Sequence, residues 1–337
     1  MGSSRENYDG MYLLRALACF LVVLSHSVSI RYYSYASEHW LPAITYTSCI
    51  RIAVPLFLMI SGYLLLDKQE NILVFYKKRA KRVLPPFFFY LVFYYVLICF
   101  HTGVPFSLDA FLQFVADGGT GQMWYLYLLI GVYTFMPFLR VIYQNSTSQE
   151  KWIFCGIWLF TSGIIPLILG YFGSTYNFAG KFSLHQFVGH FGYVFLGAWL
   201  KNFRLRWNYS LLSGYLLCTG ATIYLTYWYS YPAGDLNNIF QSKISPLTVM
   251  ATVFVFLAFK DVTLGRCSRF IREIAAHSFG IYLLHIAVIA FLRMIHINGI
   301  YGYPWIMHLV TAVVATMISF FAIKYAKKIP YVKNIVG

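Results

Sequence analysis

The chain has 337 residues, of which 59% are hydrophobic, 20% aromatic and only 11% charged, and its formal net charge is +15. Its mean hydropathy, +0.63, is high. Soluble domains are about 45–50% apolar and about 25% charged, and a folded sphere cannot bury this much apolar surface. The composition therefore excludes a soluble globular protein and indicates a polytopic membrane protein.

Long apolar runs divide the chain into candidate membrane helices. A helix needs about 20 apolar residues to cross a bilayer, and this length predicts about ten spans in a single domain over residues 1–337. The first run carries Arg15 and His26 and has no clear cleavage site, so we expect a retained helix rather than a signal peptide. The ten predicted spans, of which the sixth and eighth are short, are residues 11–30, 47–66, 83–101, 122–142, 152–172, 187–200, 209–228, 245–259, 279–296 and 304–325.

Basic residues are unevenly distributed over the segments between these spans. Most of the 26 Lys and Arg residues fall near the two termini and in the loops 67–82, 143–151, 201–208 and 260–278. Cytoplasmic loops carry an excess of Lys and Arg, so the pattern predicts an all-α membrane protein with both termini cytoplasmic. The charge therefore indicates topology, and no nucleic-acid partner is expected. The basic residues left on the outer side are Arg31, Arg51, Lys181, Lys243 and Arg293.

Acidic residues and cysteines argue against two other kinds of protein. None of the 11 acidic residues is predicted to lie in the middle of the membrane, which weighs modestly against a proton-coupled transporter. The six cysteines have no metal-ligand spacing, so we expect them to pack as small hydrophobic residues and expect no metal. The chain also lacks a glycine-rich phosphate loop and a nucleophile elbow.

Arg15 and His26 are the ionisable residues of the first predicted helix. At about 100° and 1.5 Å per residue, the 11 positions between them make about three turns and rise about 16 Å. Both side chains therefore share one face, with Arg15 near the cytoplasmic end. Taken singly, Arg15 is better explained as a charged anchor and His26 as a hydrogen-bonded residue inside the bundle. Their shared face favours a common polar channel.

Three further segments carry polar groups that we consider candidates. Arg51 lies near the outer end of the second span, and Tyr282 and His285 share a face of the ninth, where an interhelical hydrogen bond is the alternative explanation. In the second span, Gly62 allows another helix to approach closely. The loop 67–82 ends in Lys77-Lys78-Arg79-Ala80-Lys81-Arg82. Positive-inside bias alone explains some of these basic residues. Because arginine binds phosphate in a bidentate way, the functional interpretation of the rest is a site for a phosphate-bearing cytoplasmic ligand or a lipid headgroup.

In this order along the chain, the motifs resemble the acyltransferase-3 family, which consists of bacterial inner-membrane enzymes that O-acylate surface glycans. The likeness spans essentially the whole chain and is greatest to the O-acetyltransferases of enterobacterial common antigen and O-antigen. The chain departs from the family pattern at one position. Family members often have a histidine two residues before the tryptophan, where this chain has Gln122. The motifs are Arg15-x10-His26, Pro55-Leu56-Phe57-Leu58-Met59-Ile60-Ser61-Gly62-Tyr63, Arg79-x-x-Arg82, Met123-Trp124-Tyr125-Leu126-Tyr127 and Ser278-Phe279-Gly280-Ile281-Tyr282-Leu283-Leu284-His285.

The resemblance implies an acetyl-CoA donor in the cytoplasm and a hydroxyl of a lipid-linked or surface glycan as acceptor outside, with the lipid bilayer around the enzyme. Arg79 and Arg82, with Arg15, would hold the phosphates of CoA, and His26 would meet the glycan hydroxyl. Histidine is suited to general-base catalysis near neutral pH and can also carry an acyl group covalently, and both routes remain open.

Other residues complete the expected site. A carboxylate that orients His26 would come from the outer side, first from Asp117, with Glu38, Asp109 and Asp235 as the other candidates. Arg51 would stabilise the oxyanion or bind an acidic sugar. The expected substrate-binding set also contains Trp124, Tyr282 and His285.

Two other functions compete with acyl transfer. The first is an exporter of a glycan or small metabolite, in which the same helices form a path rather than a reaction chamber. The second is a membrane scaffold or sensor, which would not need Arg15 and His26 on one helix face. An oligomer is possible in each case, because Gly156 and Gly163 either line a helix interface or pack internally.

Overall fold

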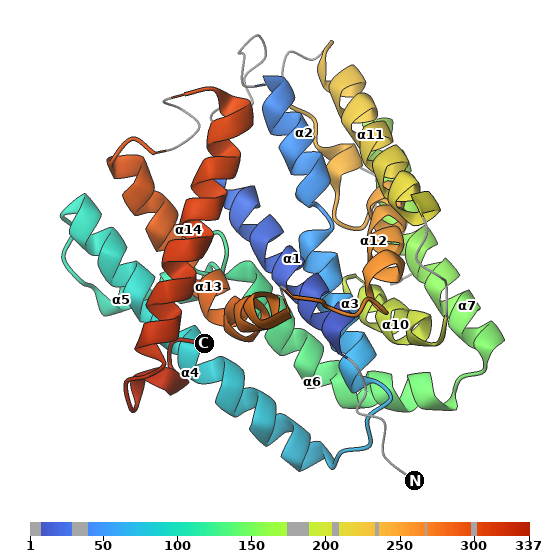
Figure 1. The fold of residues 1–337 in the computed structure, drawn as a ribbon, viewed down its shortest axis with the longest axis horizontal. Coiled ribbons are helices and arrows are strands. Elements are labelled where there is room, and N and C mark those ends of the chain that lie inside the picture. The colour runs from blue at the N-terminus through green and yellow to red at the C-terminus, as the bar shows by residue number, and fades with distance from the viewer. Residues whose placement is uncertain are drawn as a thin grey trace.

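The computed structural model describes residues 8–28, 40–173, 189–203, 209–232, 236–266, 268–297 and 302–337. Within these ranges all regular structure is helical (Figure 1). The longer helices are α1 (Asp9–Ser27), α2 (Trp40–Ile50), α3 (Ala53–Leu65), α4 (Ile72–Thr102), α6 (Trp124–Asn145), α7 (Ser148–Trp158), α11 (Tyr209–Ser230), α12 (Pro246–Phe259), α13 (Ser268–Met294) and α14 (Pro304–Ala326). The shorter ones are α5 (Leu108–Ala116), the π-helical turn η2 (Leu159–Ile164), α8 (Ile165–Tyr171), α10 (Phe191–Trp199), η4 (Leu200–Asn202), η5 (Ile239–Gln241) and η6 (Val332–Asn334).

Eight helical stretches in the described part of the chain are long and apolar enough to cross a membrane, which makes this a multi-pass membrane protein. They are Asp9–Ser27, Trp40–Leu65, Ile72–Thr102, Trp124–Asn145, Ser148–Tyr171, Ile239–Phe259, Ser268–Met294 and Pro304–Ala326. The other two predicted spans, 187–200 and 209–228, correspond to α10 and α11. Helix α10 has nine residues, which is too short for a bilayer. Helix α11 has 22, but its tyrosines and threonines lower its hydropathy.

Helix α1 lies in the middle of the bundle (Figure 1) and contacts α2, α3, α12, α13 and α14. It begins at the end of the bundle where Asp9 pairs with Arg272, near the start of α13. It ends where the Ser27 hydroxyl donates to the carbonyl of His308, near the start of α14. We name these the Arg15 end and the His26 end. Helices α1 and α13 are therefore parallel, and α14 runs antiparallel to both.

The second membrane span is broken into α2 and α3 at Arg51 and Ile52. Proline lacks an amide hydrogen, and its ring clashes with the carbonyl four residues earlier. Pro55 stands four residues after Arg51, so the regular helical hydrogen bond to the Arg51 carbonyl cannot form. The local sequence thus ends α2 at Ile50 and places the Arg51 side chain in the break between two helices.

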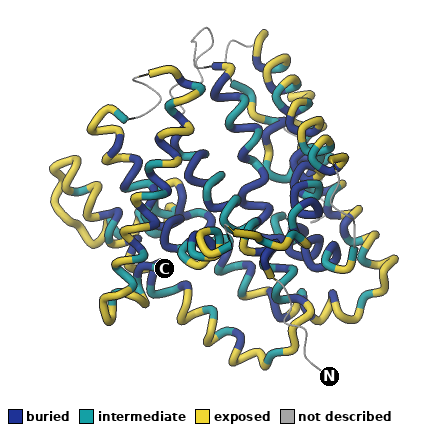
Figure 2. The backbone as a smooth tube through the Cα atoms, viewed as in Figure 1, coloured by how far each residue is buried: buried dark blue, intermediate teal, exposed yellow. Residues whose placement is uncertain are grey.

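The surface of the bundle suits lipid rather than water. Large apolar side chains are exposed along α4, α6, α7, α11 and α14, whereas the buried residues follow the central helices (Figure 2). Such an apolar exterior would cause aggregation in water but is normal in a bilayer, where interhelical packing rather than apolar burial drives association.

Small residues allow the closest helix contact, between α3 and α10. A Cβ atom added at Gly62 would lie 1.8 Å from the carbonyl oxygen of Val194, and one at Gly197 would lie 2.2 Å from the carbonyl oxygen of Met59. The expected role of Gly62 in close helix approach is therefore confirmed. Gly163 packs internally against the Ile244 carbonyl, whereas Gly156 faces open space.

We predict that Gly62→Ala destabilises the protein, because the added methyl group cannot fit unless α3 and α10 separate. Overpacking of this kind costs about 1–3 kcal/mol. The matched control is Gly131→Ala in α6, where an added Cβ meets nothing within 4 Å. The thermal unfolding temperature in detergent should fall by several degrees for Gly62→Ala and should stay unchanged or rise for Gly131→Ala. Equal unfolding temperatures for the two variants would contradict this packing.

Candidate functional site

A cavity of about 610 Å³ lies at the His26 end of the bundle. Its volume is in the range of small-molecule binding sites. His26 faces it from α1, Arg51 from the break between α2 and α3, Trp124 and Tyr125 from α6, and Tyr282 from α13. The remaining lining residues are Val22, Ser25, Val28, Thr47, Ile50, Ala53, Val54, Leu236, Asn238, Lys243 and Arg293. Four of the expected site residues, His26, Arg51, Trp124 and Tyr282, therefore share one chamber.

His26 is packed against a second histidine in this chamber. Its ring centroid lies 5.1 Å from that of His285, which in turn lies 5.7 Å from the ring of Tyr282. His285 is fully buried, and neither of its ring nitrogens has a partner of hydrogen-bond geometry in the described part of the chain. The backbone carbonyl of His26 accepts a hydrogen bond of 3.3 Å from the Arg293 guanidinium. Packing and backbone contacts thus hold the His26 ring in place.

A second, smaller pocket of about 60 Å³ lies toward the Arg15 end. Arg15 and Arg82 line it together with Ser61 and Tyr133. Two guanidinium groups facing one pocket repel each other unless an anion binds between them. Lys327, just after α14, does not line this pocket but lies near it, because burial and the nearby charge of Arg82 lower its pKa. This end of the bundle can therefore bind an anionic group between Arg15 and Arg82, and Lys327 is a nearby cation that the sequence motifs did not identify.

Tyr125 and Tyr282 line both pockets and separate them. Their rings are 5.3 Å apart and meet at 64°. The hydroxyl of Tyr282 donates to the backbone carbonyl of Gln122, which ties α13 to the start of α6. Arg15 and His26 thus face two compartments of one path along α1, with a pair of tyrosines between them.

The segment predicted as the basic loop 67–82 is helical from Ile72 onward, so Arg79 and Arg82 both lie in the first turns of α4. Arg79 lies outside both pockets. Its guanidinium pairs with the Glu70 carboxylate at 3.2 Å and lies 4.4 Å from the centroid of the Phe75 ring. The hydrogen bond from Lys78, with the charge of Arg79, keeps the pKa of Glu70 below its usual value. Arg140 of α6 donates to the carbonyls of Leu65 and Glu70. In this structure Arg79 therefore fastens the α3–α4 connection, while Arg82 faces the pocket.

Asp117, the carboxylate expected first as a partner of His26, does not line the chamber. It follows the last residue of α5, where it is exposed to solvent. Asp109 lies in the first turn of the same helix and is also exposed. Glu38 and Asp235 lie outside the described residues. In the described part of the chain, the group packed on the His26 ring is His285 instead of a carboxylate.

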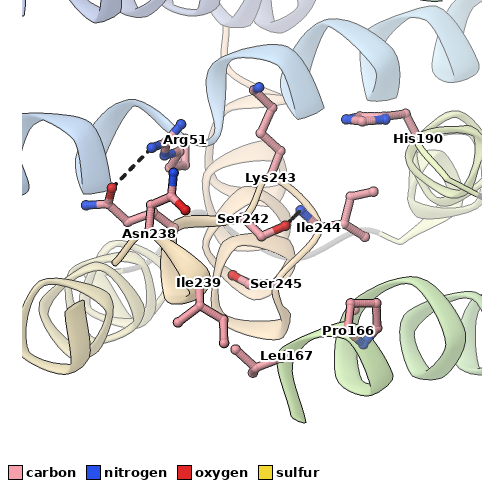
Figure 3. A pocket seen from close by; sticks show the side chains of 12 residues that line it. Arg51, Pro166, Leu167, His190, Asn238, Ile239, Ser242, Lys243, Ile244 and Ser245 are labelled. Atoms are coloured by element: carbon pink, nitrogen blue, oxygen red, sulfur yellow. Dashed lines mark hydrogen bonds between the residues drawn. The ribbon is translucent and has the colours of Figure 1, made fainter. Parts of the chain in front are cut away.

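A third cavity, of about 410 Å³, adjoins the chamber and shares Arg51, Asn238 and Lys243 with it. Lys243 lies between Arg51 and His190 (Figure 3). Its ammonium group is 4.2 Å from the centroid of the Trp124 ring, and Arg51 donates to the Gln241 side chain at 3.1 Å. Sequence analysis placed Lys243 and Arg293 on the outer side but gave them no role. The small number of basic residues on that side is the signal in the sequence that could have identified them.

Comparison with known proteins gives one match. The chain matches the family model for the acyltransferase domain, acyltransferase-3, over residues 8–325. Neither a curated protein nor a solved structure matches the chain. The match includes both arginines of the inner pocket, the histidine of the chamber and the tyrosine pair between them, and it implies membrane acyl transfer. The chain therefore belongs to the acyltransferase-3 family of membrane acyltransferases.

Proposed function

We propose that the protein transfers an acetyl group from cytoplasmic acetyl-CoA to a hydroxyl of a lipid-linked or surface glycan on the outer face of the bacterial inner membrane. One observation carries this proposal. The arginine pocket and the histidine chamber lie at successive levels of α1 and have Tyr125 and Tyr282 as common walls. Family membership supplies the reaction class, and the two compartments suit a donor and an acceptor that approach from opposite ends.

In this proposal the donor binds at the Arg15 end. Arg82 and Arg15 contact the CoA phosphates, because guanidinium groups bind phosphate in a bidentate way. Lys327 adds charge, and Arg79 joins them if it exchanges its Glu70 partner for a phosphate. The pantetheine arm then extends along α1 toward His26, over the rise of about 16 Å that the helix geometry sets between the two side chains.

The passage between the compartments must widen for this to happen. The inner pocket is only about 60 Å³, which is too small for a pantetheine arm. Tyr282 is held by its hydrogen bond to Gln122, and Tyr125 packs against both Tyr282 and Phe57. Movement of these two tyrosine rings opens the path when the donor enters. With the rings as they stand, they close the passage between the two compartments.

His26 performs the chemistry in the chamber. As general base it takes the proton of the glycan hydroxyl while the hydroxyl oxygen forms a bond to the acyl carbon. The carbon–sulfur bond of the thioester breaks, and the thiolate of CoA receives the proton. Arg51 lines the same chamber and stabilises the oxyanion that develops on the acyl carbonyl. In the covalent alternative, a ring nitrogen of His26 forms the bond to the acyl carbon while the carbon–sulfur bond breaks, and the CoA thiolate takes the ring proton. The glycan hydroxyl then attacks the same carbon, the nitrogen–carbon bond breaks, and the hydroxyl proton returns to the imidazole.

His285 is a positioning residue in this scheme. It has no access to the chamber because it is fully buried, but it contacts the His26 ring on one side and the Tyr282 ring on the other. It therefore sets the orientation of the base and couples it to the tyrosine that separates the compartments.

We predict that His26→Ala abolishes transfer of labelled acetyl from acetyl-CoA to glycan. General-base catalysis contributes about 10²–10⁴-fold to a rate, so the label should fall at least 100-fold. The measurement compares cells with the wild type, with His26→Ala and without the protein, at matched amounts of folded protein in the membrane. Equal labelling in all three would reject acyl transfer and favour the exporter.

We further predict that Arg82→Gln raises the KM for acetyl-CoA about tenfold or more, since a hydrogen bond to a charged group is lost. Lys81→Gln is the matched control, because Lys81 is an exposed neighbour that does not line the pocket. Initial rates at varied acetyl-CoA and fixed acceptor give both constants. An equal rise of KM in the two variants would reduce the role of Arg82 to general electrostatic attraction.

A further inference from the structure

Basic side chains differ in their ion pairing between the two ends of the bundle. All seven ion pairs found among the described residues lie at the Arg15 end, for example Asp9–Arg272, Glu70–Arg79 and Glu273–Lys324. At the opposite end, Lys243 and Arg293 face the His26 chamber and neither has an ion pair with a described carboxylate. Among the described residues, the ion pairs are therefore confined to the Arg15 end, and Lys243 and Arg293 at the His26 end have none.

These two cations converge on the chamber from distant parts of the chain. Arg293 lies in the last turn of α13, and Lys243 lies in the turn before α12. Arg51 joins them from the break between α2 and α3, close enough to Lys243 for the two charges to repel. None of the described residues that line the chamber or the adjoining cavity is acidic. Such an arrangement of like charges costs free energy that a bound anion recovers.

Lys243 is held in place rather than free on the surface. Its backbone carbonyl accepts a hydrogen bond of 2.5 Å from the Tyr193 hydroxyl, and its ammonium group lies over the Trp124 ring. Tyr193 is fully buried in α10. A lysine that served only to mark the outer end of a helix would extend to solvent, whereas this one turns toward the chamber.

We propose that the acceptor glycan carries an anionic group, a carboxylate or a phosphate, that binds between Lys243 and Arg293 in the His26 chamber. This inference rests on the proposed acyl transfer and adds the chemical class of its acceptor. Arg293 donates to the backbone carbonyl of His26, so the anion binds next to the base. The acetylated hydroxyl therefore belongs to the sugar that bears the anion or to its immediate neighbour.

The first test identifies where the label goes. Membrane vesicles that contain the glycans of the cell receive labelled acetyl-CoA, and the labelled glycan is fragmented and analysed by mass spectrometry. We expect the acetylated sugar or the adjacent one to carry a carboxylate or a phosphate. The mass of the fragment shows which of these two anionic groups is present. Label on a sugar with no anion on it or on either neighbour would overturn the inference. Absence of label from the wild type would instead reject acyl transfer itself.

The second test removes the charge. Lys243→Gln should raise the KM for the glycan about tenfold or more, while the KM for acetyl-CoA stays unchanged and Lys243→Arg keeps most of the affinity. Methyl glucuronide and methyl glucoside 6-phosphate should inhibit the wild type at lower concentration than methyl glucoside, and this difference should shrink in Lys243→Gln. The matched control is Lys333→Gln, an exposed change near the C-terminus. Unchanged KM values in Lys243→Gln would overturn the inference.

Discussion

The cost of placing Arg15 and His26 in a hydrocarbon layer is the constraint on which the rest of the structure depends. A charged or polar group that faces lipid is expensive, so such groups face the interior of a bundle. Helix α1 carries both residues on one face, and five other helices contact it. The central place of α1 follows from this requirement. The same packing creates the two compartments, because the polar face of α1 meets side chains of α6 and α13 that do not fill the space at either level.

The two compartments differ in how the bundle holds charge. At the Arg15 end, carboxylates such as Glu70 and Asp9 fix the connections between helices, so basic residues there have both a structural and a binding role. Arg79 shows this double use, since it is paired in the present structure while its neighbour Arg82 faces the pocket. At the His26 end the described cations face a cavity instead. This difference would suit a donor with several phosphates at the Arg15 end and an acceptor with a single anionic group at the His26 end.

The features that could be predicted from the sequence are those that depend on helical periodicity and on the length of apolar runs. The common face of Arg15 and His26 follows from 3.6 residues per turn, and eight of the ten predicted spans correspond to candidate membrane helices. The predicted span 187–200 is longer than the helix α10, because an apolar run does not show where a helix begins or ends. Trp124 was expected at the site from the family resemblance, but the convergence of Lys243 and Arg293 on the His26 chamber was not predictable, since it depends on how three separate segments pack. His285 was expected to bind substrate, whereas the structure buries it outside the chamber against the His26 ring. That contact joins two helices that are far apart in the sequence, so it too depends on packing.

The central claim is that one path along α1 connects a donor at the Arg15 end with an acceptor at the His26 end. Its most direct test is a sided measurement in proteoliposomes with uniform protein orientation. Labelled acetyl-CoA is supplied on one side only, and the acetylated glycan is located by its accessibility to a membrane-impermeant esterase. The account predicts a product that is protected on the donor side and cleaved on the opposite side. A product that is cleaved on the side where acetyl-CoA was supplied would contradict it.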